Sequence, residues 1–218
     1  MKQADAPDRF AFERVWWGRG TTRLAGVDEA GRGPLAGPVV VAAVCLPPRW
    51  LDDGLPKALR GLNDSKQLTE AQREKFFAAL TADPEVRFGI AQVEPAVIDA
   101  INILQATHLA MNEALAQLRP APQHALVDGR PVKTLRFPHT AIVKGDSLSF
   151  SIAAASVLAK VTRDRRMVGY HRQFPPYGFA VHKGYGTPQH LAALAAHGPC
   201  PIHRRSFHWQ KPVQRELL

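Results

Sequence analysis

The residues best suited to chemistry in this chain are two adjacent acids, Asp28 and Glu29. They follow the apolar run of residues 24–27, which is typical of a buried strand, and they precede a glycine-arginine-glycine turn at residues 31–33. Two carboxylates at the end of a buried strand repel each other and lose hydration, so the pair is costly unless a cation or a shared proton relieves it. The stretch therefore predicts a metal site.

Two further apolar runs are followed by an acid in the same way. Asp128 comes directly after the run that ends at Val127, and Asp146 comes shortly after the run that ends at Val143. If these runs and the first one are neighbouring strands of one sheet, their ends lie at one edge and four carboxylates converge. Carboxylate oxygens suit Mg²⁺ or Mn²⁺, and two such ions about 3.5–4 Å apart can hold the attacking and leaving oxygens of a phosphoryl displacement. Four negative charges would roughly neutralise the two ions.

Each of the later acids also has a purely structural interpretation. Asp128 precedes Gly129 and could form an Asx-turn, and Asp146 precedes Ser147 at an expected helix start, where it could act as a cap. These alternatives stay open from the residues alone. The adjacent acids 28 and 29 are harder to explain by either role.

Other chemistries have weaker support. Residues 31–37 form neither a GxGxxG fingerprint nor a P-loop, because Pro34 and the glycine spacing break both patterns. The nine histidines show no HExxH or zinc-ligand spacing, so those between residues 182 and 208 are expected to be surface or phosphate-facing imidazoles. No serine, including Ser147, has a recognisable base and orienting partner.

The elements that must position the acids follow from the apolar patterns. We expect strands over residues 24–27, 37–46, 86–93, 124–128 and 140–143, with the first two paired as neighbours. Helices are expected from Thr69, which begins a capping box with Gln72, and from Pro95 to Leu118. The apolar stripe of the second helix is expected to consist of Ile98, Ile101, Leu104, Leu109, Ala114 and Leu118. A helix after Ser147 should pack closely in its first half and face solvent or ligand in its second, and a short helix should cover residues 188–196. Residues 1–20 are expected to form an N-terminal extension.

Composition points to a polyanionic partner. The chain has 218 residues, a net charge of +9 and a pI of about 10.0. From residue 160 to the end it carries ten of its 28 Lys and Arg residues but only two of its 19 acids. Nucleic acid is the first expectation, although a basic face that merely aids solubility is possible. The two cysteines form no CxxC, and no leader or membrane-spanning segment is recognised, so we expect a soluble cytoplasmic protein.

At these same residues the sequence resembles the ribonuclease HII family. The matching motifs run in family order from about residue 22 to residue 208, and they cover nearly the whole chain. They are Asp-Glu-Ala-Gly-Arg-Gly at 28–33, Asp-Ser-Lys at 64–66, Val-Asp-Gly at 127–129, Lys-Gly-Asp at 144–146, Ser-x-x-Ala-Lys-x-x-Arg-Asp at 156–164, Lys-Gly-Tyr-Gly-Thr at 183–187 and His-Arg-x-Ser-Phe at 203–207. His182 departs from the asparagine that many family members have.

The resemblance implies an α/β fold with an RNase H-like mixed sheet flanked by helices and a small helical C-terminal part, within a catalytic domain spanning residues 21–218. It implies hydrolysis of the RNA strand of RNA–DNA hybrids and incision on the 5′ side of single ribonucleotides in duplex DNA, leaving 3′-hydroxyl and 5′-phosphate ends. By position, Asp28, Glu29, Asp128 and Asp146 match the family's catalytic carboxylates, which hold two Mg²⁺ or Mn²⁺ ions. The protein is expected to act as a monomer.

Substrate-reading residues are also implied by the resemblance. Gly31, Arg32 and Gly33 match the segment that reads the ribonucleotide's 2′-hydroxyl, and glycines let the backbone approach the minor groove where that group lies. Tyr185 matches the tyrosine that packs on the deoxyribose at the RNA-to-DNA junction. A simple tight turn and an ordinary turn-flanking aromatic are the structural alternatives.

Lys66, Lys144 and Lys183 are candidates for phosphate contact, with solvated lysines as the alternative. Two other functions remain to be distinguished from the nuclease implied by the family. One is a non-catalytic module that binds RNA–DNA hybrids, against which the intact acid set argues. The other is a DNA nuclease of the same fold, which would cut a duplex made entirely of DNA.

Overall fold

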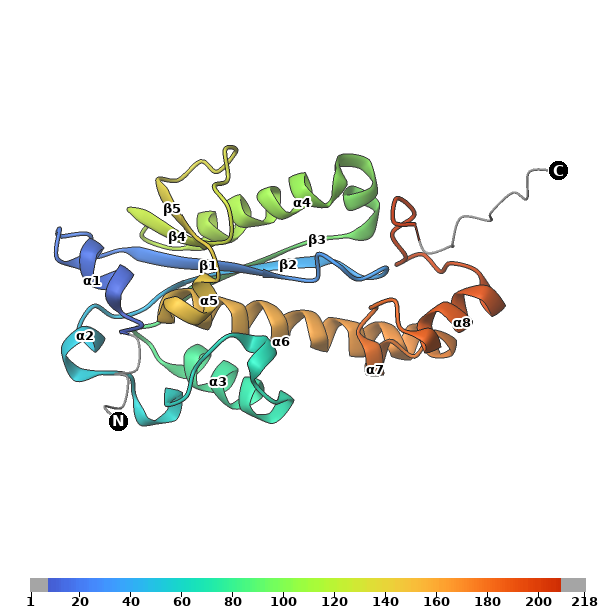
Figure 1. Ribbon diagram of the computed structural model, residues 1–218, viewed down its shortest axis with the longest axis horizontal. Helices are drawn as coiled ribbons and strands as arrows, with labels where there is room; N and C mark the ends of the chain where they lie inside the picture. Colours follow the sequence, from blue (N-terminus) through green and yellow to red (C-terminus); the bar gives the residue numbers. More distant parts are fainter. Residues whose placement is uncertain (1–7, 209–218) are drawn as a thin grey trace, which may run out of the picture.

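Five strands form one mixed sheet in the order β3-β2-β1-β4-β5 (Figure 1). The computed structural model describes residues 8–208. Strand β1 pairs antiparallel with β2 and parallel with β4, which fixes the edge where the acids lie; β2–β3 is antiparallel and β4–β5 parallel. The strands are β1 Leu24–Ala30, β2 Val39–Cys45, β3 Arg87–Val93, β4 His124–Asp128 and β5 His139–Ile142.

The helices cover both faces of this sheet. Helices α4 and α6 lie on opposite faces, and α7 and α8 form a small C-terminal part beyond the sheet (Figure 1). The helices are α1 Ala11–Trp17, α2 Trp50–Asp53, α3 Glu70–Ala82, α4 Pro95–Gln117, α5 Gly145–Leu148, α6 Phe150–Gln173, α7 Phe179–His182 and α8 Pro188–His197, with 3-10 turns at Lys57–Leu59, Ser65–Gln67 and Pro175–Tyr177. None of the described helices is long and apolar enough to cross a bilayer.

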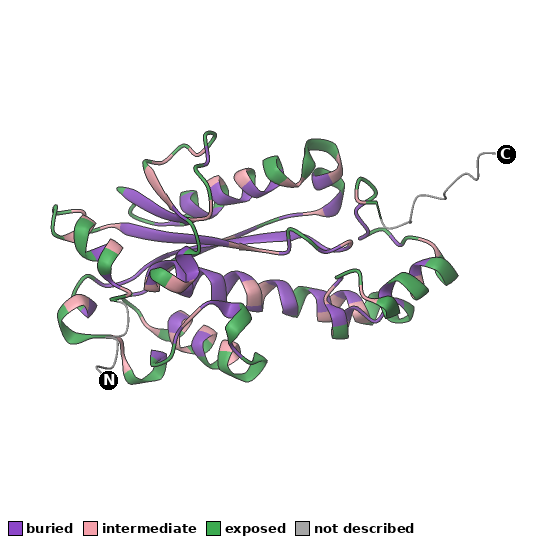
Figure 2. Cartoon of the chain, in the orientation of Figure 1, coloured by how far each residue is buried: buried purple, intermediate pink, exposed green. Residues whose placement is uncertain are grey.

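Strand β2 shows why the sheet needs helices on both sides. All seven of its residues are buried (Figure 2). Val40, Ala42 and Val44 belong to a core with residues of α3 and α6, whereas the alternating residues pack in a second core with α4. A strand buried on both faces has a continuous apolar sequence rather than an alternating one, and the run at residues 39–46 has this form.

Helix α6 approaches β1 closely at Gly26, which has no side chain. A Cβ on Gly26 would lie 2.1 Å from the backbone of Ser151, so only glycine fits there. The first half of α6 packs closely, as expected. Its second half was expected to face solvent or ligand, and this is wrong for one side of the helix, where Arg163, Asp164 and Met167 are buried. The reason is that the C-terminal part folds back over this end of the helix.

Helix α4 is present with the expected start at Pro95, and half of its expected stripe is buried, namely Ile98, Ala114 and Leu118. Ile101, Leu104 and Leu109 are exposed. Asn102 has φ 66° and interrupts the helix, and its side-chain oxygen accepts from the amides of Leu104 and Gln105. The interruption changes which residues of the helix face the sheet.

The residues before β1 pack against the helices around the site. Glu13 of α1 is buried, and its carboxylate accepts from the Ser149 hydroxyl and the Ser151 amide. The guanidinium of Arg9 donates to the backbone carbonyl of Asp146 at 2.8 Å. Residues 8–20 therefore support the catalytic part of the fold, while residues 1–7 lie outside the described range. The capping box of Thr69 and Gln72 is confirmed.

Three of the five histidines between residues 182 and 208 lie in the interior, while His197 and His208 are exposed. His182, His190 and His203 are buried, and the rings of His182 and His190 stack with centroids 4.5 Å apart. The Nε2 atoms of His190 and His203 are 3.0 Å apart. The expectation of surface imidazoles is wrong for these three, because they fill a small core and bond the backbone around it. The short helix is confirmed as α8, whereas the last basic residues, 211 and 215, lie outside the described range.

Candidate active site

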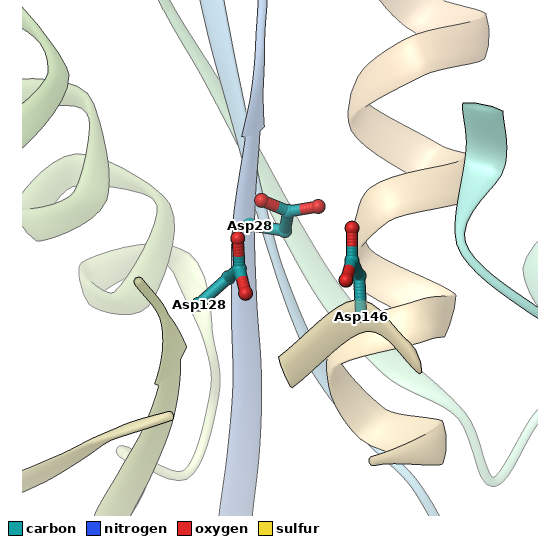
Figure 3. Close-up of side chains that lie close together, drawn as sticks. All are labelled: Asp28, Asp128 and Asp146. Carbon is teal, nitrogen blue, oxygen red and sulfur yellow. The ribbon is translucent and has the colours of Figure 1, made fainter. Parts of the chain in front are cut away.

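Three aspartates from three elements meet at one edge of the sheet. Ligand oxygens of Asp28, Asp128 and Asp146, which we call the acid group, all lie within 4.8 Å of one another (Figure 3). β1 and β4 are parallel with Val27 opposite Val127, so the next residue on each strand is an aspartate. Asp146 comes from the short helix α5 rather than from a strand end.

A backbone contact ties α5 to the end of β4. The amide of Gly145 donates to Oδ1 of Asp128 at 2.6 Å, and a Cβ on Gly145 would lie 2.5 Å from Ile152. The glycine thus lets α5 approach close enough to bring Asp146 to the other two acids. Asp146 was expected shortly after a strand that ends at Val143; β5 ends at Ile142, and Asp146 follows on α5 after a turn.

Glu29 lies beside the acid group but is not part of it. Neighbouring residues on a strand project to opposite faces, so Asp28 faces α6 while Glu29 faces the α4 side. The Glu29 carboxylate forms an ion pair with the Arg32 guanidinium at 3.3 Å. It lines a cleft together with Asp128 and residues of α4. Three of the four expected carboxylates therefore converge tightly, and the fourth, Glu29, lines a cleft together with Asp28 and Asp128.

The electrostatics of the acid group are unfavourable without a counterion. Burial and the charges of Glu29 and Asp128 raise the pKa of Asp28 well above its usual range. Burial, together with repulsion from Asp128 and Asp64, raises the pKa of Asp146, although Lys66 acts against this. Burial also raises the pKa of Glu29 against the opposing effect of Arg32.

This donor set fits a divalent cation. It consists of carboxylate oxygens, the ligands that Mg²⁺ and Mn²⁺ prefer, and they are gathered where their mutual repulsion is relieved by positive charge. Among the described side chains, Lys66 forms an ion pair with the Asp146 carboxylate: its Nζ lies 3.5 Å from Oδ2 of Asp146 and 3.8 Å from Oδ1 of Asp64. The Lys66 side chain is 77% exposed. One exposed ammonium does not balance the group.

The expected substrate-reading residues share a cleft with Asp28, Glu29 and Asp128. The cleft has a volume of about 220 Å³. Gly33 and Tyr185 face each other across it, since a Cβ on Gly33 would lie 3.9 Å from the Tyr185 ring. Tyr185 is half exposed, so its ring is available to a ligand. The expected residues that line this cleft are Asp28, Glu29, Gly31, Arg32, Gly33, Lys66, Asp128 and Tyr185.

A larger cleft of about 760 Å³ adjoins the first on the α4 side. Glu29, Arg32 and Asp128 belong to both clefts. The basic residues Arg130 and Lys133 line the larger cleft beyond the acids. Together the two clefts form a path of cationic character that passes the acid group.

Two of the three expected lysines lie away from these clefts. Lys144 is exposed at the N-terminal end of α5, and Lys183 donates to the carbonyl of Ala180. Both have positive φ, 59° and 51°. Neither is among the described residues that line the two clefts.

Sequence reasoning missed two kinds of residue at the site. Lys160 lines the smaller cleft and pairs with Asp164 at 2.8 Å, and its place in the Ser-x-x-Ala-Lys motif was the available signal. Arg163 and Arg204 belong to the basic C-terminal third and to two of the family motifs, but the sequence assigned neither a role. Both are fully buried and bond the backbone beside the cleft.

Comparison with known proteins supports the family resemblance seen in the sequence motifs. The family described as Ribonuclease HII matches residues 25–210. A ribonuclease HII of Acidovorax sp. (strain JS42) is 57% identical over 194 residues, covering 89% of this chain and 88% of the relative. One from Ruminiclostridium cellulolyticum is 52% identical, covering 90% of this chain and 74% of the relative.

Solved structures agree with the sequence relatives. The crystal structure of ribonuclease H2 from Pyrococcus horikoshii OT3 superposes with a TM-score of 0.71 at 31% identity, covering 86% of this chain and 94% of that one. The expected fold, a mixed sheet flanked by helices with a small helical C-terminal part, is confirmed. The chain belongs to the ribonuclease HII family of metal-dependent endoribonucleases.

Proposed function

We propose that this protein hydrolyses the RNA strand of RNA–DNA hybrids and cuts on the 5′ side of single ribonucleotides embedded in duplex DNA, leaving 3′-hydroxyl and 5′-phosphate ends. The observation that carries the proposal is the shared cleft, in which Asp28 and Asp128 of the acid group lie beside residues 31–33 and Tyr185. A cleft of this kind can test the sugar next to the phosphate that is attacked.

The acid group and Glu29 are the proposed ligands of two Mg²⁺ or Mn²⁺ ions. When bound, such ions supply the positive charge that activates a water and stabilises the leaving oxygen in phosphodiester hydrolysis. The chain's own part is to hold the oxygens in place. The Gly145 amide fixes Asp128, and the Glu29 amide donates to Asp28 at 2.7 Å.

Sugar recognition is assigned to the opposite wall of the cleft. Gly33 has no side chain to separate its backbone from a ligand, and the Tyr185 ring lies across from it. A ring packed on a deoxyribose would be disturbed by an added 2′-hydroxyl, whereas backbone groups near residues 31–33 can bond that hydroxyl. The two features together would select an RNA-to-DNA junction.

Phosphate contacts are assigned to the cationic side chains along the path. Lys66 lies beside the acid group, and Arg130 and Lys133 line the larger cleft. We also keep Lys144 and Lys183 as proposed contacts with more distant phosphates. Binding through such contacts weakens as salt concentration rises.

The test is cleavage of matched duplexes that contain no, one or four consecutive ribonucleotides, with Mg²⁺ or Mn²⁺. We expect cutting only where ribonucleotides are present. Replacing Asp128→Asn should lower the rate by about 10²–10³-fold or more, because it removes charge that the reaction centre needs. Glu113→Gln, which changes an exposed acid of α4, is the control and should leave the rate unchanged.

Other outcomes would identify the alternatives. Tight binding of a hybrid with no product under either metal would favour a binding module. Cutting of the all-DNA duplex would favour a DNA nuclease. We further propose that the protein acts as a monomer, since one chain supplies every residue of the site, and light scattering at working concentration measures this directly.

A further inference from the structure

Two arginines are buried beside the cleft, and we call them the guanidinium pair: Arg163 of α6 and Arg204 near the end of the described chain. The Arg204 side chain is 0% exposed and that of Arg163 is 1% exposed. Among the described residues neither forms an ion pair with a carboxylate. Their partners are backbone carbonyls, those of Ala36, Pro38 and Lys183 for Arg163, and those of Gly31, Arg32 and Gly37 for Arg204.

This is a costly way to hold a loop. A buried cation loses its hydration, and two of them near each other also repel. Burial lowers the pKa of Arg204 to about 9, with repulsion from Arg163 as the next cause. Because residues 31–38 carry five of the six bonded carbonyls, the cost is concentrated on one segment, whose first three residues are those assigned to sugar recognition.

The packing around Gly31 shows how closely the loop and the pair fit. Gly31 has φ 94°, and a Cβ there would lie 2.0 Å from Nε of Arg163. The Arg204 amide also donates to the carbonyl of Leu35 at 2.9 Å. The C-terminal part and the loop are therefore one packed unit rather than two neighbours.

The direction of the bonded carbonyls decides where the next amides point. In a trans peptide the C=O of one residue and the N–H of the next point in opposite directions. Arg204 draws the carbonyls of Gly31 and Arg32 inward, at 2.5 and 2.9 Å. The N–H groups of Arg32 and Gly33 must then point away from Arg204. Neither has a hydrogen-bond partner among the described residues, and both residues line the cleft.

We propose that Arg204 is a positioning residue for ribonucleotide recognition: by binding the carbonyls of Gly31 and Arg32, it presents the amide N–H groups of Arg32 and Gly33 to an oxygen of the substrate. This rests on the function proposed above. Arg204 does not touch the substrate in this scheme. It fixes the orientation of two peptide groups, and the N–H groups of these peptides contact the substrate.

The test compares Arg204→Lys and Arg204→Gln with Arg205→Gln. Arg205 is the matched control, because it is the adjacent residue, its side chain is exposed, and its loss changes the net charge equally. We expect Arg204→Gln to lower kcat/KM on the single-ribonucleotide duplex by about 10- to 100-fold. Arg204→Lys should lose less, since its ammonium can still bond one of the carbonyls, and Arg205→Gln should stay within about twofold of the wild type.

Two measurements separate positioning from general damage. The first is Mn²⁺ affinity by calorimetry, which should be unchanged in the Arg204→Lys variant because the acid group is held by other contacts. The second is the ¹H–¹⁵N spectrum, in which the amides of Arg32 and Gly33 should shift in Arg204→Lys and not in Arg205→Gln. If Arg204→Gln does not fold, these readouts on Arg204→Lys decide the question.

The proposal is overturned if both amides keep their shifts in Arg204→Lys, or if that variant matches the wild type in kcat/KM. Equal loss on the one- and four-ribonucleotide duplexes together with weakened Mn²⁺ binding would also overturn it. Failure of the proposed function would look different: the wild type itself would cut neither duplex, while the amide shifts would still report on the positioning contact.

Discussion

Two groups of like charges lie on either side of one cleft, and they are treated in opposite ways. The acid group holds three carboxylates whose oxygens face one another with one exposed lysine nearby. The guanidinium pair holds two cations, and each is bonded to three carbonyl oxygens. The cations are satisfied by the protein alone, whereas the carboxylates are not.

The difference indicates which buried charges serve structure and which serve ligand binding. A buried charge whose hydrogen-bonding capacity is filled by the fold contributes to the folded state. A cluster whose repulsion raises its own pKa values stores unfavourable energy until something positive binds. The structural and the ligand-binding charges can therefore be told apart by measuring how protein stability changes when each charged residue is replaced by a neutral one.

The largest effect is expected at Arg163. Arg163→Gln removes donors from three buried carbonyls and should lower the free energy of unfolding by about 3 kcal/mol or more, measured by chemical denaturation. Arg165→Gln is the control. That side chain is 55% exposed and pairs with Glu74, so its loss should cost about 1 kcal/mol or less. Equal costs for the two variants would show that the buried guanidinium is not structural.

In the acid group, a neutral substitution is expected to raise the stability of the protein rather than lower it. Without divalent metal, Asp28→Asn should stabilise the protein while abolishing cleavage, because a carboxyl whose folded-state pKa is raised destabilises the fold at neutral pH. Each kcal/mol gained raises Tm by about 2–4 °C at this chain length. The gain should shrink as pH falls and the wild-type acid becomes protonated.

Asp164→Asn provides the matched control for that experiment. Asp164 is also a buried aspartate, but it pairs with Lys160 at 2.8 Å, so its neutralisation should lower Tm. Adding Mg²⁺ should raise the Tm of the wild type more than that of Asp28→Asn, since a ligand stabilises the state that binds it. A fall in Tm for Asp28→Asn in a chelator would contradict the idea of stored repulsion.

The smallest effect is expected at His203, a buried titratable residue that stays neutral in the folded protein. Burial, with the neighbouring His190, lowers the pKa of His203 to about 4. The unfolded chain binds a proton near pH 6.5 while the folded chain does not, so stability should fall as pH drops from about 6.5 to 4. We expect His203→Asn to reduce this loss by about 1 kcal/mol, measured by denaturation at several pH values. Parallel curves for the two proteins would show that His203 is protonated in the fold.

Much of the site followed from local sequence. An apolar run ending in Asp28, and another ending in Asp128, predicted strands whose acids adjoin, because strand pairing places equivalent positions side by side. The capping box at Thr69 and the Pro95 helix start are also local signals, and both are present. The family motifs added Tyr185, which lies across the cleft from Gly33.

The features that sequence did not reveal depend on contacts between distant segments. Glu29 turns away from the acid group because strands alternate, and Asp146 arrives from a short helix rather than a strand. His190 was expected to be a surface or phosphate-facing imidazole, and the guanidinium pair was assigned no role of its own from the sequence, because charged and polar side chains usually remain in water. The residue type tells us that burying an arginine is unfavourable. Only the tertiary structure brings the backbone carbonyls that bind the buried guanidinium groups and offset this cost. The sequence by itself determined the acids and their strands, and the tertiary structure decided which charges the fold satisfies and which it leaves for metal and substrate.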